Sequence, residues 1–268
     1  MLPAALLLLL LGGARALFGG RDAAPRQFPF QALTHGFHPD LLRNFGTGAL
    51  IHPEWVLTTA ESVAGFVALN VTLGVVERDS DEAWRQDIPA VSVHLHPEWP
   101  GRQHWKRMHL NDVALVRLSR PARLDDKVQV AHLPKRGQWY GGRGLSVSGW
   151  GRHQTSYGLR DQNHLKWEET SSVGFLSCFW KRFSVSEHTG WVHAEHICAD
   201  TKGQGPCDND GGAPLVRFTE AGTKAVVLGL FTTPTIYGEY CGTDIPSVYT
   251  RVSAHLDWIR EASGLTPQ

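Results

Sequence analysis

Hydrophobic and polar residues alternate in short runs along much of the chain, which is the pattern of strands with one buried face. Residues 112–118 (Asp-Val-Ala-Leu-Val-Arg-Leu) and 247–252 (Ser-Val-Tyr-Thr-Arg-Val) are clear examples. Glycine and proline clusters separate such runs, at 141–144, 203–206 and 234–238. One segment, about 253–262, has helical spacing instead. The pattern predicts an all-β sandwich or barrel pair that ends in a single α-helix.

The N-terminus predicts secretion. Six leucines, Leu6 to Leu11, precede Gly12-Gly13 and then Ala14-Arg15-Ala16. A short apolar run that ends in a small-x-small site is typical of a signal peptide, and it is shorter than the roughly 18 residues that span a bilayer. We therefore expect residues 1–16 to be removed and the mature chain to begin at Leu17. The expected location is extracellular, and storage in granules before release is one form that secretion could take.

Secretion changes how two other features are interpreted. The four cysteines are expected to form disulfides, and spacing alone leaves all three pairings open. Asn70-Val71-Thr72 is a sequon for N-glycosylation, which places Asn70 near the surface.

Composition excludes some classes of function. The 268 residues are 42% hydrophobic and 19% charged, which is unlike a disordered chain. The 26 basic and 26 acidic side chains balance, which argues against a nucleic-acid coat protein. We expect no nucleic-acid partner and no membrane span. The expected state is a monomer.

Three segments, in order, resemble the chymotrypsin-like (trypsin family) serine proteases. Residues 17–20 (Leu-Phe-Gly-Gly) are similar to the family's Ile-Val-Gly-Gly start, 56–62 to the loop that usually ends Thr-Ala-Ala-His-Cys, and 207–214 to the nucleophile loop, Cys-x-Gly-Asp-Ser-Gly-Gly-Pro. Further matches lie at 111–115, 149–151 and 248–259. The resemblance covers residues 17–264.

The resemblance implies two six-stranded antiparallel β-barrels with a cleft between them. The first would span about 29–135 and the second about 136–252. The C-terminal helix would follow at about 253–262.

The matched positions indicate that the catalytic triad is degenerate. In this mechanism a serine attacks, a histidine takes its proton and an aspartate orients the histidine. Gly211 stands at the nucleophile position, Glu61 at the base position and Asp112 at the orienting position. We therefore expect no functional catalytic residues and a pseudoprotease. An alternative is a hydrolase with rebuilt chemistry that uses Glu61 and Asp112 as an acid/base pair.

The rest of the cleft departs from the family as well. Asn209 replaces a glycine of the oxyanion loop, and asparagine tolerates positive φ better than most residues. Gly205-Pro206 at the floor of the specificity pocket supplies no carboxylate for Lys or Arg. Pro234 removes a backbone N–H from the wall formed by residues 232–234. Val75 replaces an acidic calcium ligand, so neither calcium nor any other cofactor is expected.

The resemblance also implies disulfide pairs and a buried ion pair. Cys178 would pair with Cys198, and Cys207 with Cys241. Asp210 would receive the Leu17 ammonium, whereas the alternative is that Asp210 only caps a turn. Two other family disulfides are missing at both ends, at Gly46 with Ser62 and at Leu145 with Arg217.

Within the family the pattern is similar to azurocidin, a catalytically dead member that binds anionic glycans or bacterial lipid in innate defence. The expected partner is therefore an unknown protein, glycan or lipid. Two basic clusters offer an anionic-ligand patch, with ordinary solvated charge as the alternative: Arg102, Lys106 and Arg107, and Lys181 with Arg182. The mature formal charge of −1 departs from strongly basic azurocidin.

Fourteen histidines raise the question of a metal site. His94 and His96 would share a strand face, and His193 would lie near His196 or His188. Because no cysteine accompanies them at a zinc spacing, we expect no metal.

Overall fold

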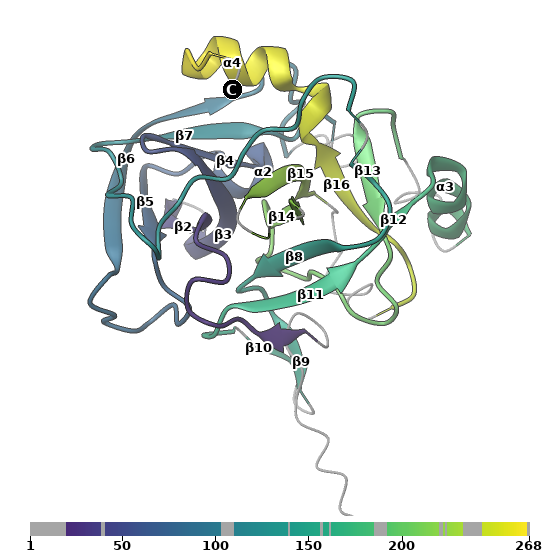
Figure 1. Ribbon diagram of the computed structural model, residues 1–268, viewed down its shortest axis with the longest axis horizontal. Coiled ribbons are helices and arrows are strands. Elements are labelled where there is room, and N and C mark those ends of the chain that lie inside the picture. The colour runs from purple at the N-terminus through teal and green to yellow at the C-terminus, as the bar shows by residue number, and fades with distance from the viewer. Residues whose placement is uncertain are drawn as a thin grey trace, which may run out of the picture.

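A computed structural model describes residues 20–38, 41–102, 110–138, 140–155, 158–160, 162–184, 192–219, 222, 224–232 and 243–266. Figure 1 shows two β-sheet units side by side, with one helix across the top and another at the right-hand edge. No helix within these ranges is long and apolar enough to cross a membrane.

The first unit is a closed barrel of six antiparallel strands, counted over the described ranges, in the order β2-β3-β4-β7-β6-β5. The strands are β2 (Gln31–His38), β3 (Leu41–His52), β4 (Trp55–Thr58), β5 (Ala68–Leu73), β6 (Gln86–Leu95) and β7 (Ala114–Leu118). Period-two alternation explains β5 well, because Leu69, Val71 and Leu73 belong to the barrel core. The intervening Asn70 and Thr72 lie on the opposite face of the strand, where Asn70 is half-buried and Thr72 is covered by its neighbours.

The second unit is a sheet of eight strands in the described part of the chain, in the order β1-β11-β8-β14-β15-β16-β13-β12. Its strands are β1 (Arg21–Asp22), β8 (Leu145–Gly149), β11 (Lys166–Thr170), β12 (Ser172–Val173), β13 (His196–Ala199), β14 (Pro214–Phe218), β15 (Ala225–Phe231) and β16 (Ser247–Arg251). The strands β9 (His153–Thr155) and β10 (Gly158–Arg160) form a separate hairpin.

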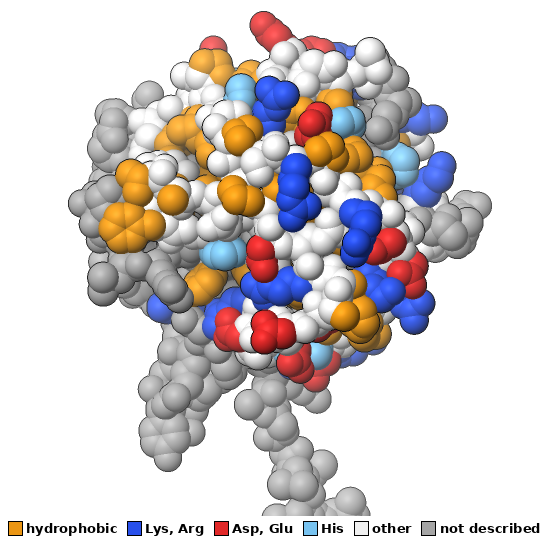
Figure 2. All heavy atoms as spheres, turned by 90° about the vertical axis from the view of Figure 1, so that its left-hand side faces the viewer, with side chains coloured by type: hydrophobic (Ala, Val, Ile, Leu, Met, Phe, Trp, Pro, Cys, Tyr) orange, Lys and Arg blue, Asp and Glu red, His pale blue; other side chains and the backbone are white. Residues whose placement is uncertain are grey.

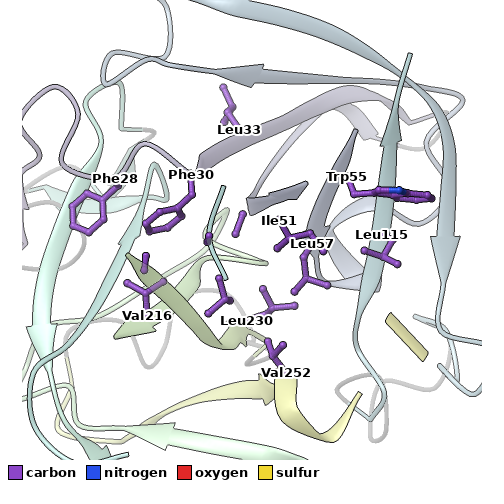
Figure 3. Packing of buried hydrophobic residues seen from close by; sticks show 14 of the residues in the cluster. Phe28, Phe30, Leu33, Ile51, Trp55, Leu57, Leu115, Val216, Leu230 and Val252 are labelled. Carbon is purple, nitrogen blue, oxygen red and sulfur yellow. The ribbon is translucent and has the colours of Figure 1, made fainter. Parts of the chain in front are cut away.

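The largest hydrophobic cluster joins the two units. Figure 3 shows Leu57 and Leu115 from the first barrel near Leu230 of the second sheet and near Val252, which directly follows β16. Burying apolar side chains from both sheets holds the two units together at the place where the cleft residues meet.

The expected all-β fold with two barrel-like sheets and a C-terminal helix is confirmed. Two details differ. The second sheet gains the two-residue strands β1 and β12 beyond the six expected. The C-terminal helix is divided at His255 into the 3₁₀ turn η1 (Val252–Ala254) and α4 (Leu256–Ser263). Gly264 ends α4 in a left-handed conformation, with φ of 71°.

The sequence pattern did not predict two other helices, α2 (Ala60–Val63) and α3 (Phe175–Phe183). In α3 the buried residues are Cys178 and Arg182, whereas its aromatic residues are largely exposed. Helices are usually predicted from apolar residues that face the core at helical spacing. In α3 most of the apolar residues face solvent instead, so this pattern does not predict the helix.

Candidate functional site

The three triad-equivalent residues come from separate elements that meet between the two sheets. Glu61 lies in α2, directly after β4, Asp112 precedes β7 and Gly211 precedes β14. The Glu61 N–H donates to Asp112 Oδ1 at 2.7 Å, so the structure brings these two residues together as expected. Thr232 Oγ1 donates to Asp112 Oδ2.

Asp112 is only 1% exposed, and burial raises its pKa to about 7. The hydrogen bond from Thr232 opposes this rise, and the nearby charge of Glu61 adds to it. With its two oxygens accepting from Glu61 and Thr232, Asp112 is a fixed acceptor beneath α2.

The Glu61 side chain turns to Arg102. Arg102 Nε lies 3.5 Å from Glu61 Oε1, and Arg102 Nη2 also donates to the Glu61 backbone carbonyl. Arg102, one of the residues expected in an anionic-ligand patch, is therefore paired with Glu61. Lys106 and Arg107, the other members of that cluster, lie outside the described residues.

The hydroxyl of Ser62 lies next to the place that a side chain at Gly211 would occupy. A Cβ built on Gly211 would lie 2.5 Å from Ser62 Oγ and 3.7 Å from Glu61 Oε2. Ser62 is 3% exposed, and its hydroxyl shares a 2.5 Å hydrogen bond with Thr59 Oγ1. The side chain nearest to the nucleophile position is thus buried and already partnered.

Ser62 also stands opposite Gly46, the pair of positions at which one family disulfide is missing. A Cβ built on Gly46 would lie 3.0 Å from Ser62 Cβ, so these two positions face each other as the resemblance implies. Leu145 and Arg217, the other cysteine-less pair, are cross-strand neighbours in β8 and β14.

The segment that resembles the oxyanion loop contains a left-handed residue. Asn209 has φ of 68°, in the left-handed region that asparagine tolerates. The Gly211 carbonyl accepts from the Thr47 N–H at 2.8 Å.

Asp210 is fully buried beside the 149–151 turn. It accepts hydrogen bonds from Gly151 N at 2.7 Å and from Cys207 N at 3.0 Å. A Cβ at Gly149 or Gly151 would lie about 2 Å from this carboxyl group, which explains why both positions are glycine. Burial raises the pKa of Asp210 to about 7, and the two N–H hydrogen bonds oppose this rise. Leu17, its expected partner, lies outside the described residues.

Glu168 is a buried carboxyl group that the sequence analysis missed. It lies on β11 and is 5% exposed, and burial raises its pKa to about 8 with a further contribution from the charges of Asp210 and Asp200. Its Oε1 lies 3.6 Å from a Cβ built on Gly205. A carboxyl group therefore does lie beside the expected pocket floor, although Gly205 itself has none. Alternation along Glu168-Glu169 would have predicted that one of the two points inward.

One cysteine pair is confirmed directly. Cys178 on α3 and Cys198 on β13 form a disulfide. Cys207 is also disulfide-bonded, and Cys241 lies outside the described residues.

The second basic cluster is not a patch. Arg182 is 4% exposed, and its Nη1 donates to the Pro246 carbonyl at 3.0 Å. Lys181 is exposed. Neighbours on a helix point about 100° apart, so the two side chains separate and the prediction for Arg182 is wrong.

The histidines do not gather around one centre in the described ranges, where no group of three metal-ligating side chains occurs. His94 contacts Trp55, whereas His96 contacts His255 and Trp258. The rings of His193 and His196 do lie close, with centroids 5.7 Å apart, and His188 lies outside the described residues.

Comparisons with known proteins agree with this geometry. The family model described as Trypsin matches residues 17–259. Proproteinase E of Bos taurus is 32% identical over 247 residues, covering 90% of this chain and 92% of that protein. Phenoloxidase-activating factor 3 of Holotrichia diomphalia is 30% identical over 264 residues, covering 91% of this chain and 72% of that protein.

Solved structures share the fold. HL collagenase superposes with a TM-score of 0.76 at 24% identity, covering 93% of this chain and 99% of that one. The family model and the relatives that cover nearly the whole chain show that the chain belongs to the trypsin family of serine proteases.

Proposed function

We propose that this trypsin-family member has lost proteolysis and acts as a secreted binding protein. The observation that carries the proposal is that a Cβ built on Gly211 would lie 2.5 Å from the hydroxyl of Ser62. Serine catalysis needs a hydroxyl next to a general base. Among the described residues, the side chain nearest to the nucleophile's place is that of Ser62, which is buried and bonded to Thr59. The base position holds a glutamate that is paired with arginine.

The loss is large on the scale of enzyme rates. Removing one triad member lowers the rate of such enzymes by about 10⁴- to 10⁶-fold. Gly211 and Glu61 replace two members. We expect the mature protein to leave peptide and ester substrates uncleaved.

The alternative is a hydrolase that uses the carboxylates of Glu61 and Asp112. The geometry offers it little support, because the carboxylate of Glu61 points to Arg102 and Asp112 is buried. A screen of peptide, ester and glycoside substrates tests it. Turnover that both Glu61→Gln and Asp112→Asn abolish would establish the alternative and refute the loss of catalysis.

We also propose that the mature N-terminus is inserted beside Asp210. The support is that the carboxyl group of Asp210 is fully buried and accepts only two backbone N–H bonds from the described residues. The charge of Asp210 also contributes to the raised pKa of the nearby Glu168. An ammonium group at Leu17 would neutralise this region.

The ligand class follows from charge. Figure 2 shows basic and acidic side chains interspersed on one face of the first barrel rather than a patch of one sign. This face therefore does not offer the basic surface that an azurocidin-like preference for strongly anionic glycans would need. We expect retention of the mature protein on immobilised heparin to be weak at physiological salt. Tight retention that falls steeply with added salt would support the azurocidin-like alternative.

A further inference from the structure

The outer surface of the first barrel carries a hollow beside β2 and β5. Its volume is about 500 Å³, within the range of roughly 300 to 1,000 Å³ in which proteins hold small ligands. The hollow lies away from the cleft residues, since none of Glu61, Asp112 and Gly211 lines it.

Asn70 forms part of the wall of this hollow. Its neighbours Leu69 and Val71 point into the barrel core, so the alternation of β5 turns Asn70 outward. Its side chain is half-buried, and its amide has no hydrogen-bond partner among the described residues. Asn70 is the acceptor of the sequon, so a glycan attached there would begin inside the hollow.

The walls suit a sugar. Phe37 is 53% exposed at the hollow, and the Phe45 ring lies under the guanidinium of Arg78 at 4.5 Å. The C–H faces of pyranose rings pack against aromatic side chains, which bury large apolar areas in such contacts. His35 adds a third ring to the same wall.

The charges of the walls are already balanced. Arg78 pairs with Asp79 at 3.1 Å, and Arg85 pairs with Asp87 at 2.7 Å. A hollow with paired charges favours a neutral polar occupant over an anionic one, because an anion would have to compete with these carboxylates.

We propose that an N-linked glycan on Asn70 folds back into this hollow, with its innermost N-acetylglucosamine residues packed against Phe37 and Phe45. The proposal rests on the secretory route and not on the loss of catalysis. Thr72, the third sequon residue, is fully buried and bonds to His35 at 3.0 Å and to Asp87 at 2.5 Å. The glycan is therefore added before β5 pairs with its neighbours.

The test uses the full chain secreted from eukaryotic cells. Mass spectrometry before and after peptide N-glycosidase treatment measures occupancy of Asn70, and the rate of release is compared for native and urea-unfolded protein. We expect a glycan at Asn70 that is released several-fold more slowly from the native protein. Phe37→Ala is expected to remove most of this protection.

Val91→Ala is the matched control, because Val91 is 62% exposed on β6 and does not line the hollow. This variant is expected to keep the slow release. An unmodified Asn70, or equal release rates for the wild type and Phe37→Ala, would overturn the proposal. Proteolytic activity in the same preparation would instead contradict the proposed function and leave the glycan result unaffected.

Discussion

Ser62 lies beside the place that a side chain at Gly211 would occupy, so each position restricts what the other can hold. The hydroxyl of Ser62 lies 2.5 Å from the position of a Cβ built on Gly211, which is too close for both to stay in place. A side chain introduced at Gly211 would therefore meet Ser62, and we expect that restoring this one residue does not restore catalysis.

We predict that Gly211→Ser yields no hydrolysis and lowers the free energy of unfolding by about 1 to 3 kcal/mol, the usual effect of overpacking. The added Cβ would lie 2.5 Å from Ser62 Oγ. Thermal denaturation and an ester assay measure the two effects. Adding Ser62→Ala is expected to recover most of the lost stability.

The control is Gly174→Ser, where a Cβ meets nothing within 4 Å and the residue is the N-cap of α3. Serine is favoured there, so this variant is expected to be neutral or slightly stabilising. Equal stability of Gly211→Ser and the wild type would show that Ser62 does not block the site.

Single positions differ in how far the sequence predicts them. The motifs located Glu61, Asp112 and Gly211, and residue type predicted the left-handed conformation of Asn209. The bond between Arg102 and Glu61 and the burial of Glu168 depend on side chains that meet from separate segments. A local sequence pattern does not predict contacts between residues that are far apart in the chain.

At the scale of elements, α3 departs most from the sequence prediction. Its buried residues are a cysteine and an arginine, and Phe175, Leu176, Trp180 and Phe183 are among the most exposed large hydrophobic side chains of the described ranges. Periodicity predicted the strands because their apolar residues do face the core. It failed for α3 because its anchors are a disulfide and a hydrogen bond.

We predict opposite outcomes for two neighbouring substitutions in α3. Arg182→Met removes the donor to the Pro246 carbonyl and is expected to lower the free energy of unfolding by about 1 to 3 kcal/mol. Lys181→Met, at an exposed position, is expected to change it by less than about 0.5 kcal/mol. Urea denaturation measures both. Similar effects for the two variants would argue against the burial of Arg182.

The Cys178–Cys198 disulfide fixes α3 to β13 across a sequence separation of 20 residues. We predict that replacing both cysteines by serine lowers the free energy of unfolding by about 3 kcal/mol, the value expected for a loop of this size. Denaturant unfolding of the double variant measures it. No change would show that packing alone holds the helix.

At the scale of the whole molecule, the two-sheet architecture was predictable because its motifs are spread over the full length and each marks one end of a strand. The strand count of the second sheet was not, since β1 and β12 are two residues each and are held by pairing with distant strands rather than by their own sequence.

Buried carboxyl groups give the molecule a definite pH dependence. The pKa of Asp210 is raised from 3.8 to about 7 and that of Glu168 from 4.5 to about 8. A raised folded-state pKa means that the native state keeps protons that the unfolded chain releases. The stability from these groups is therefore full below about pH 4 and is lost as the pH rises to 7 and 8.

We predict that the mature N-terminus reverses this loss for Asp210. A chain that begins at Leu17 and one that retains residues 15 and 16 should be equally stable near pH 4. At pH 7 the Leu17 chain should be more stable by about 3 to 5 kcal/mol, because only its ammonium pairs with the ionised carboxylate. Thermal denaturation across pH measures this.

Asp210→Asn supplies the control, because it removes the ionisable partner and should abolish the difference between the two chains. Equal stability of both chains at every pH would contradict insertion of the N-terminus.

The central claim, that no competent nucleophile remains, is tested most directly by fluorophosphonate labelling of the purified mature protein, read by intact mass with an active trypsin-family protease as the positive control. We predict no added mass after prolonged incubation. A stoichiometric adduct, above all one that maps to Ser62 and disappears in Ser62→Ala, would show that the cleft still holds a reactive serine and would contradict the account.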